Sequence, residues 1–392
     1  MLDIDVTRVR EDTLTCSQLI HFNNAGAALS PQSVSRAVID HLALEQAIGG
    51  YEAADQQAHQ WAEFYQHLAT LLNAHSDEIA FAESATRAWE MAFHSLDWQP
   101  GDQIITHATD YVSNHLTYLF ATQTKGIEVV LVPSSPLGRI DVSALEACIT
   151  PKTKMIAVTH LASQGGAIQP VVEIGRIAQA HHLWYLLDAC QSAGQIPLDV
   201  RALQCDFLTG TGRKFLRGPR GTGFLYVNNA RLQQVRPPFV DLQSASWTAD
   251  HAFEWCTGAK RFESWERFVA GQLGLSQAVA YAVDLGVDRI QRRIQRLSQV
   301  LIEQLNSING VSNVSTLESL SGIVTFRAST QSADAVVHAL RIKNINVSRV
   351  LQEQARLDLG VRGIPDLVRA SVHYYNTFEE IDQFCLELER CI

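Results

Sequence analysis

The sequence predicts an α/β protein with a mostly parallel sheet between helices, followed by a smaller C-terminal α+β domain. Three observations predict this fold. Up to Phe268, short apolar and β-branched runs alternate with helical patterns. These runs are continuously hydrophobic, as strands buried on both faces require. After Phe268 the pattern changes to long helices and then to short strands, so the 392 residues are expected to form two domains.

The strands and helices of the large domain follow from apolar runs and from the turn residues between them. A first helix is expected to open near Ser30, with a proline in its first turn. A second is expected from about Thr86, and Pro100-Gly101 predicts the turn that ends this region. Another helix should follow Pro170. The predicted strands span residues 103–106, 128–132, 154–158, 183–188, 206–209 and 223–227.

The C-terminal region is predicted as linking helices followed by the small domain. Segment 351–367 is the least regular part of the chain and is expected to be a loop. The predicted divisions are an N-terminal segment (1–20), the large domain (21–267), and the linking helices with the small domain (268–392). The expected helices of this region span 269–285, 289–305 and 332–340 and a last one starts near 379, with strands at 322–328, 345–349 and 369–374.

Composition excludes several classes of protein. The net charge of −10 argues against a nucleic-acid binder, which usually has a basic face. No run of eighteen apolar residues is present to suggest a membrane span, and the acidic start does not resemble a signal peptide. The seven cysteines are scattered and form no C-x-x-C pair. We therefore expect reduced thiols in a cytoplasmic protein, with neither a disulfide framework nor a metal site.

Two residues with opposite charges carry the first functional hypothesis. Asp188 closes the apolar run LWYLLD, and Lys214 follows the next predicted strand, in TGTGRKF. Ligands of an open parallel sheet bind beyond the carboxyl ends of its strands, so both side chains are expected in one crevice. The alternative is that Asp188 caps a turn and that Lys214 belongs to a solvated basic turn.

The turn around Lys214 also suits a phosphate. Thr211 and Arg213 bring a hydroxyl and a guanidinium to it, and small neighbours allow close approach of the backbone. Pyridoxal 5′-phosphate needs a lysine for a Schiff base, a carboxylate against its pyridinium nitrogen and anchors for its phosphate. The sequence therefore predicts pyridoxal phosphate as the cofactor.

The stretch from Leu186 to Val227 resembles the fold-type I pyridoxal-phosphate enzymes of the class V aminotransferase and cysteine desulfurase family. Those enzymes have an apolar strand that ends in D-x-x-Q, then [ST]-G-x-K and a G-P-x-G-x-G turn. The resemblance favours the isopenicillin N epimerase-like and C–S lyase branch over a true desulfurase. Further matching segments, from about residue 20 to the C-terminus, are HFNNAGAALSP, FAESATRAWEMAF, THLASQGGAIQP and RASVHYYNTFEEID.

The resemblance implies a role for each residue of the main motif. Lys214 would form the Schiff base, Asp188 would pair with the ring nitrogen, and Gln191 would hydrogen-bond the phenolic oxygen. Thr211 and Arg213 would hold the phosphate, with Arg213 in place of the family's histidine. Each of these roles is what the match to the family's motif implies.

Further cofactor contacts are implied by the other matches. Thr86 and Arg87 lie at a predicted helix start, where backbone N–H groups would bind the phosphate. Tyr111, in DYVSN, replaces the family's ring-stacking histidine. A phenol stacks as well, but its ordinary pKa of about 10 makes it a poor acid–base at neutral pH. Ser163 matches an asparagine near the phenolic oxygen, with Gln164 as the alternative donor.

The substrate side is implied by two matches. Arg369 matches the arginine that clamps the α-carboxylate of an amino-acid substrate, and Asn24, beside Asn23, matches the N-terminal segment that lines this side. Three arginines of the 346–368 region would read a second carboxylate or form a solvated face; they are Arg349, Arg356 and Arg362.

The reaction is left open by the sequence. A desulfurase needs a cysteine on the loop at 346–368, and none is present; Cys256 is the one thiol near another family landmark. The remaining hypotheses are an aminotransferase or a β-eliminating C–S lyase, acting at Cα through an external aldimine and a quinonoid. The alternative is an amino-acid epimerase. A hypothesis of another class is a catalytically silent protein that binds pyridoxal phosphate and serves in interactions.

The resemblance also implies a homodimer with the site at its interface. The matching region is 259–268, from which Ser264, Trp265 or Arg267 would contact the partner's cofactor.

Overall fold

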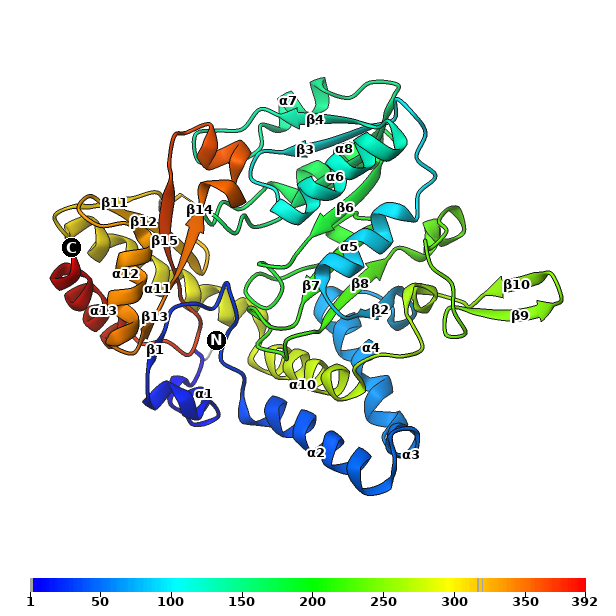
Figure 1. The fold of residues 1–392 in the computed structure, drawn as a ribbon, viewed down its shortest axis with the longest axis horizontal. Coiled ribbons are helices and arrows are strands. Elements are labelled where there is room, and N and C mark those ends of the chain that lie inside the picture. Colours follow the sequence, from blue (N-terminus) through cyan, green and yellow to red (C-terminus); the bar gives the residue numbers. More distant parts are fainter. Residues whose placement is uncertain (1–2, 316, 319) are drawn as a thin grey trace.

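The computed structural model describes residues 3–315, 317–318 and 320–392. A large α/β body is followed by a smaller α+β body at one end, and a β-hairpin projects from the other end (Figure 1). The hairpin consists of β9 (Ala245–Ala249) and β10 (Ala252–Trp255). The predicted fold class is confirmed.

A seven-stranded sheet forms the centre of the large body, with the order β2-β8-β7-β6-β5-β3-β4. All neighbouring pairs from β7 to β4 are parallel, and β8 runs antiparallel to both of its neighbours. The strands are β2 (Ile79–Ala82), β3 (Gln103–His107), β4 (Glu128–Val132), β5 (Thr153–Thr159), β6 (Trp184–Asp188), β7 (Phe207–Thr211) and β8 (Gly223–Val227).

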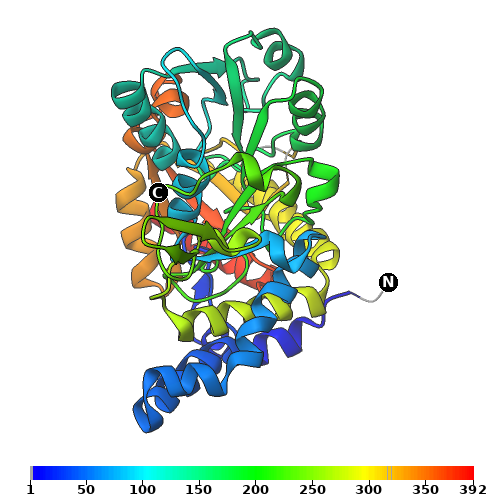
Figure 2. The same cartoon turned by 90° about the vertical axis from the view of Figure 1, so that its right-hand side faces the viewer.

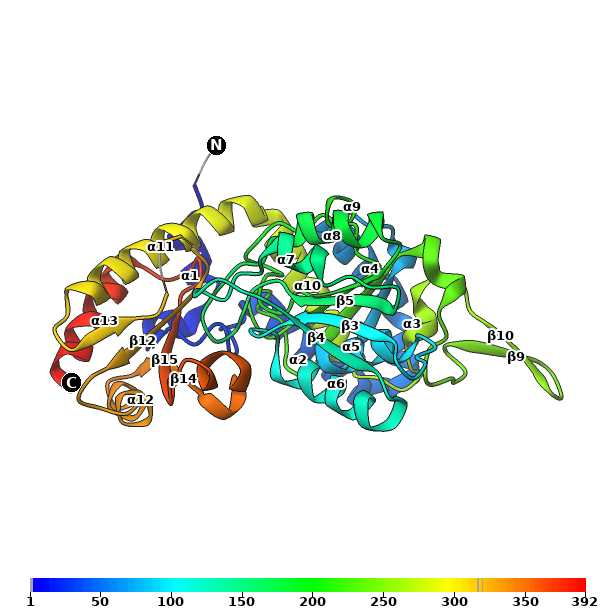
Figure 3. The same ribbon diagram turned by 90° about the horizontal axis from the view of Figure 1, so that it is seen from above.

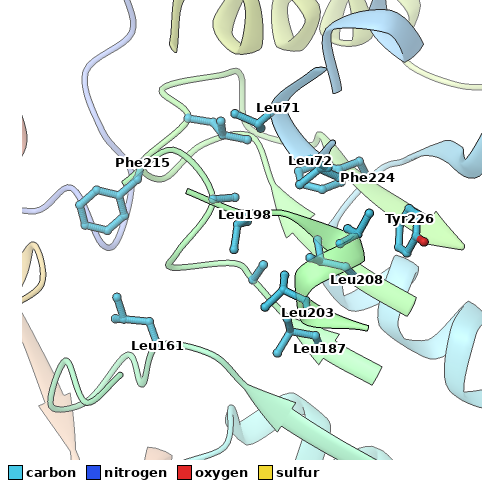
Figure 4. Packing of buried hydrophobic residues seen from close by; sticks show 14 of the residues in the cluster. Leu71, Leu72, Leu161, Leu187, Leu198, Leu203, Leu208, Phe215, Phe224 and Tyr226 are labelled. Atoms are coloured by element: carbon cyan, nitrogen blue, oxygen red, sulfur yellow. The ribbon is translucent and has the colours of Figure 1, made fainter. Parts of the chain in front are cut away.

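Helices cover both faces of this sheet, which explains why its strands are hydrophobic throughout. Successive side chains of a strand point to opposite faces, so Leu187 packs in one core and Leu186 in the other. Figure 3 shows α8 and α9 on one side of the sheet and α6 on the other. Figure 4 shows the first core, where Leu187, Leu208 and Phe224 pack together.

Three helices of the large body, α2, α5 and α8, lie where the apolar patterns predicted them, and α10 was predicted as a linking helix, whereas the others were not located from the sequence. Figure 2 shows the blue helices of residues 32–56 projecting beyond the body. The bounds are α1 (Val6–Glu11), α2 (Gln32–Ile48), α3 (Gly50–Gln56), α4 (Ala58–Leu72), α5 (Ala85–His94), α6 (Val112–Lys125), α7 (Val142–Ala147), α8 (Val171–Ala180), α9 (Val200–Leu203) and α10 (Val269–Leu285).

The small body packs helices against an antiparallel sheet of order β11-β12-β15-β14. A short parallel pair, β1 with β13, joins the N-terminal segment to it. The elements are β1 (Ile20–His21), α11 (Val287–Ser307), β11 (Val311–Asn313), β12 (Ile323–Ala328), α12 (Ala333–Ile342), β13 (Ile345–Asn346), β14 (Ser348–Leu351), β15 (Asp366–Ser371) and α13 (Phe378–Cys391). The predicted domain boundaries remain a prediction, although Phe22 packs in the core of the small body.

Two local expectations differ from the structure. Helix α2 has Pro31 as its N-cap, one residue later than expected, and makes no side-chain cap there, because proline lacks a side-chain acceptor. The segment predicted as a loop holds short helical turns at Gln352–Gln354 and Arg356–Gly360. These turns form because Ala355 and Leu359 bury their side chains in a small apolar cluster.

Among the described residues, no helix combines the length and the apolar character that crossing a bilayer requires.

Arg217 ties the turn after Lys214 to both ends of the chain. It is fully buried, and its Nε donates to the Leu29 carbonyl at 2.7 Å. Its Nη1 donates to the Tyr374 hydroxyl at 2.7 Å, and its Nη2 donates to the Thr13 hydroxyl. A guanidinium provides five donors in a fixed fork, so one side chain can hold three separate segments in register.

We predict that Arg217→Lys lowers the free energy of unfolding by roughly 2–4 kcal/mol, because an ammonium keeps the charge but cannot reach all three acceptors. Urea denaturation measures this loss. The matched control is Arg220→Lys, which changes an exposed arginine of the same turn. Equal midpoints for the two variants would contradict the proposed clamp.

Candidate active site

The carboxyl ends of four parallel strands meet at one edge of the large sheet. They are the ends of β3, β5, β6 and β7, which carry His107, Thr159, Asp188 and Thr211. This is the edge at which an open α/β sheet binds its ligands. The loops that follow these strands carry most of the predicted site residues.

Asp188 and Lys214 are both buried beside this edge, with exposures of 4% and 6%. Burial raises the pKa of Asp188, which is partly offset by the Cys190 amide that donates to its Oδ1 at 2.8 Å and by Lys214. Burial likewise lowers the pKa of Lys214. A carboxylate held in this way suits a protonated ring nitrogen, and a lysine with a lowered pKa has a larger fraction of the neutral amine that attacks an aldehyde.

The side-chain amide of Asn114 bridges Asp188 and a second buried carboxylate, Asp110. Asn114 Nδ2 donates to Asp188 Oδ2 at 3.2 Å and to Asp110 Oδ1 at 3.0 Å. Asp110 also accepts from the Tyr118 hydroxyl at 2.8 Å. Sequence reasoning assigned no role to Asp110 or Asn114, although both lie in the DYVSN stretch that was matched for Tyr111.

A cavity of about 290 Å³ opens in front of Lys214. The predicted residues that line it are Tyr111, Ser163, Gln191, Arg213, Lys214 and Arg369. The ring of Tyr111 faces Lys214, with the Nζ atom 5.7 Å from the ring centroid. A flat cofactor held by Lys214 would therefore lie within reach of the phenol face.

Two glutamines give the cavity unpartnered polar atoms. Gln191 donates one amide hydrogen to the Ala25 carbonyl at 3.1 Å, while its Oε1 is buried without a partner. Gln164 is buried with its Nε2 unpartnered, and its Oε1 accepts from the Ser163 hydroxyl at 3.2 Å. Buried polar atoms without partners are costly, so they point to a polar ligand. The Gln164 Nε2 can donate to an acceptor such as a phenolic oxygen, whereas the Gln191 Oε1 can only accept. Gln164 offers a stronger donor than Ser163.

The predicted phosphate residues lie beside the cavity. A methyl group at Gly223 would come within 2.8 Å of the Ser84 carbonyl carbon, so β8 begins directly against the start of α5. Thr211 is the β7 neighbour of Gly223, which places it near Thr86. Ser84 already caps the Arg87 amide at 3.1 Å. The backbone amides at the start of α5 that the Ser84 side chain leaves free are therefore those before Arg87, and phosphate binding there stays a prediction.

Arg87 and Arg213, the two arginines expected at the phosphate, point in different directions. Arg87 places its guanidinium 4.3 Å from the Phe239 ring, outside the cavity. Arg213 turns into the cavity, where its Nη1 donates to the Gly26 carbonyl at 3.0 Å. Its predicted phosphate contact stays a prediction.

Arg369 lies on β15 with two of its donors fixed. Nε donates to the Ser348 hydroxyl at 3.1 Å and Nη1 to the Ser163 carbonyl at 2.9 Å. Burial first, and Arg213 second, lower the pKa of Arg369 to about 10. Its remaining N–H groups are available for a substrate carboxylate.

Asn24 does not line the cavity. It is fully buried, its Nδ2 donates to the Ser371 carbonyl at 2.7 Å, and its Oδ1 accepts from the Tyr375 hydroxyl. The geometry thus favours a positioning role for Asn24, which holds Ala25 and Gly26 against the cavity.

The other residues of interest lie apart from the cavity or are already paired. Arg362 pairs with Asp358 at 3.2 Å, and Arg267 pairs with the buried carboxylate of Glu263. Arg349 lines the cavity mouth and pairs with Asp334. Within the described part of the chain, no group of three histidine, cysteine or acidic side chains is arranged to hold a metal ion.

Comparison with known proteins agrees with this geometry. A family model described as aminotransferase class-V matches residues 20–384. A probable cysteine desulfurase of Xylella fastidiosa (strain Temecula1) is 30% identical over 393 residues, which cover 94% of this chain and 90% of the relative. The apo structure of a cysteine desulfurase from Thermococcus onnurineus NA1 has a TM-score of 0.92 at 26% identity, over 100% of this chain and 98% of that one.

A lysine-to-alanine mutant of C-DES, with glycine covalently linked to its PLP cofactor, shows the same fold. Its TM-score is 0.89 at 24% identity, over 98% of this chain and 99% of that one. Fold and site together define an enzyme that depends on pyridoxal phosphate. The chain belongs to the class-V aminotransferase family. The predicted family, cofactor and enzymatic character are confirmed.

The buried side chain of His107, at the end of β3, makes the stability of the protein depend on pH. It is fully buried, its Nε2 accepts from the Thr159 amide at 3.1 Å, and burial lowers its pKa to about 4. The unfolded chain protonates this histidine near its ordinary pKa of about 6.5. The stability that the neutral ring contributes is complete above that pH and is lost as the pH falls toward 4.

We predict that His107 makes the free energy of unfolding fall by on the order of 3 kcal/mol between pH 6.5 and pH 4. His107→Gln keeps an acceptor for the Thr159 amide and does not titrate, so its stability should fall less steeply over this range. Urea denaturation at several pH values measures the slope. His59→Gln, an exposed histidine of α4, is the control and should keep the wild-type slope.

Proposed function

We propose that this enzyme breaks a C–S bond of a cysteine-type amino acid by β-elimination, without a persulfide relay through a loop thiol. The observation that carries the proposal is the composition of the cavity. It brings Lys214, Tyr111 and Arg369 together, while the neighbouring loop contributes Arg349 and Gln354 and has no cysteine. Relatives named cysteine desulfurase support chemistry at a cysteine C–S bond.

The residues present fit the cofactor, and we assign each a part of it. Asp188 would face the ring nitrogen, Gln191 the phenolic oxygen and Tyr111 one face of the ring. The phosphate would lie at the start of α5, near Thr86 and Thr211. When bound, pyridoxal phosphate withdraws electrons from the substrate's Cα.

Lys214 has two tasks in this proposal. Its amine would hold the cofactor, and the same amine would take the proton from Cα of the bound substrate. Burial lowers the pKa of Lys214, so its neutral form is more populated at physiological pH than that of an exposed lysine. Arg369 would bind the α-carboxylate and thereby fix Cα beside Lys214.

A persulfide relay would need a cysteine thiol on the loop beside the cavity to accept the sulfur atom. The residues from 346 to 368 contain no cysteine. Cys256 does not line the cavity, and partial burial raises the pKa of its thiol, which disfavours the reactive thiolate. Sulfur would therefore leave as a free thiol or persulfide.

Epimerisation is less well supported. It needs a second proton donor on the face opposite Lys214, and the described residues that line the cavity include no histidine and no carboxylic acid, which leaves the weakly acidic phenol of Tyr111. Transamination uses the same residues and is separated from elimination by its need for a 2-oxo acid.

The direct test is to incubate the holoenzyme with cysteine and its S-conjugates. Pyruvate and ammonia should appear without a 2-oxo acid. Amino transfer that depends on a 2-oxo acid would contradict elimination and favour an aminotransferase, and altered chirality without products would favour an epimerase.

We predict that Lys214→Ala abolishes labelling by borohydride, which fixes a pyridoxyl group on a Schiff-base lysine, and lowers pyruvate release by roughly 10²–10⁴-fold. Mass spectrometry of peptides locates the label. Lys152→Ala, an exposed lysine, is the control. A label retained in Lys214→Ala would remove the lysine assignment.

We predict that Arg369→Ala raises the KM for amino acids by about 10- to 100-fold and leaves the visible absorbance of the bound cofactor intact, because it removes a charge-assisted contact to the α-carboxylate. Arg327→Ala changes an exposed arginine on β12 of the same sheet and should match the wild type. Loss of the cofactor absorbance in Arg369→Ala alone would contradict its substrate role.

We also propose a homodimer that covers the outer side of the phosphate site. Exposed apolar side chains line a cleft with Thr86 and Arg87, namely Leu116, Phe120 and Phe239. Light scattering after size-exclusion chromatography tests this, and a monomer at micromolar concentration would contradict it.

A further inference from the structure

A second buried carboxylate, Asp110, lies close to Asp188 and has no part in the proposed function. It follows β3 and is only 3% exposed, and its two oxygens accept five hydrogen bonds. The donors are the Tyr111 amide at 2.7 Å, the Thr106 and Tyr118 hydroxyls at 2.8 Å each, the Asn114 side chain at 3.0 Å and the Thr159 hydroxyl. All five donors are uncharged, so they solvate the carboxylate without cancelling its charge.

The side chain of Asp110 is a carboxylate at neutral pH. Burial raises its pKa, but neighbouring histidines and the hydrogen bonds from Thr159 and Asn114 outweigh this effect, so the pKa lies below its ordinary value. His107 does not neutralise the carboxylate at that pH, because burial lowers the pKa of the ring to about 4. The negative charge acts on Asp188, whose pKa is raised first by burial and also by Asp110.

Asn114 joins the two carboxylates through a single nitrogen atom. Its Nδ2 donates one hydrogen to Asp110 at 3.0 Å and the other to Asp188 at 3.2 Å. Carboxylates only accept hydrogen bonds, so the amide nitrogen and not the amide oxygen must face both. Two carboxylates this close repel each other, and a cation beside them relieves the repulsion. The pair therefore favours a cationic partner such as a protonated ring nitrogen.

Asp110 also fixes the residue that would face the cofactor ring. Its Oδ1 accepts from the Tyr111 amide, which lies 3.2 Å from the Thr159 hydroxyl as well. Tyr111 is the N-cap of α6, and Asn114 lies in the first turn of that helix. One oxygen of Asp110 thus holds both the backbone of Tyr111 and the side chain that reaches Asp188.

We propose that Asp110 is a positioning residue for the cofactor ring. Through Asn114 it keeps a second buried negative charge next to Asp188, so that the enzyme binds a ring with a cationic nitrogen in preference to a neutral ring of the same shape. The inference rests on the proposed function, in which Asp188 faces the ring nitrogen. It does not depend on which bond of the substrate breaks.

The test compares pyridoxal 5′-phosphate with 1-deazapyridoxal 5′-phosphate, in which a C–H group replaces the ring nitrogen. Calorimetric titration of the full-length apoenzyme gives a dissociation constant for each. Both compounds carry the same aldehyde and phosphate, so a change in the ratio of these constants between variants reports on the ring nitrogen alone. Asp110→Asn removes the charge and nearly keeps the shape, and the preference for pyridoxal phosphate should fall about tenfold.

Three further variants separate the charge from the structure. Asp110→Ser also removes the charge, with a smaller side chain that leaves room for water, and it should lower the preference if Asp110→Asn does not fold. Asp110→Glu keeps the charge and should keep most of the preference. Thr106→Val is the matched control, because it removes one hydrogen bond to Asp110 and no charge, and its ratio should stay within about twofold of the wild type.

Asp188→Asn tells this inference apart from the assignment on which it rests. Its preference for pyridoxal phosphate should fall by about a hundredfold, since the nearer charge is lost. If it falls there but not in the variants of Asp110 that lack the charge, Asp188 keeps its assignment and the role of Asp110 is overturned. Equal weakening of both ligands in those variants, or a loss of preference in Thr106→Val, would overturn that role as well.

An unchanged ratio in Asp188→Asn would instead refute the contact between Asp188 and the ring nitrogen, and the inference would fall with it. Neither result depends on pyruvate release, which tests the proposed elimination separately.

Discussion

The burial of two opposite charges at the ends of neighbouring strands is the constraint on which this site depends. Asp188 ends β6, and Lys214 follows β7, its parallel neighbour. Neither charge is stable in a dry interior by itself, so the surrounding structure supplies donors such as the Cys190 amide and Asn114 to the carboxylate. In the proposed function the cofactor would complete this arrangement, with its cationic nitrogen facing Asp188 and its aldehyde facing Lys214.

The small body and the N-terminal segment close the cavity that the sheet opens. Arg369 reaches it from β15, and Ala25 and Gly26 reach it from the segment that follows β1. Arg217 holds the lysine turn against Leu29 and Tyr374. It thereby fixes the N-terminal segment and the small body relative to Lys214. The cavity is therefore built partly from strand ends of the large sheet and partly from segments that are distant from them in sequence.

Two sequence differences within the common fold distinguish this chain from a desulfurase that uses a cysteine on the loop. The loop at 346–368 has no cysteine, and the lysine turn has Arg213 where the resemblance implies a histidine. The first difference removes the nucleophile that a persulfide relay needs, and the second exchanges one cationic or hydrogen-bonding group for a permanent cation. The described residues that line the cavity include Lys214 and Arg369 and no cysteine, which supports the proposed elimination over a persulfide relay.

The sequence by itself determined the fold class, the cofactor, six of the seven central strands (all but β2), and the position of Asp188 and Lys214 after neighbouring strands. These follow from local patterns, since a buried strand and the residue at its end are contiguous in sequence. The tertiary structure decided the rest. Asn114 joins Asp188 across 74 positions, and Arg213 meets Gly26 across 187. The β1–β13 pair, two residues long, has no periodicity to detect. Such contacts depend on how separate segments pack, and side-chain direction within a cavity is set by the neighbours that packing provides.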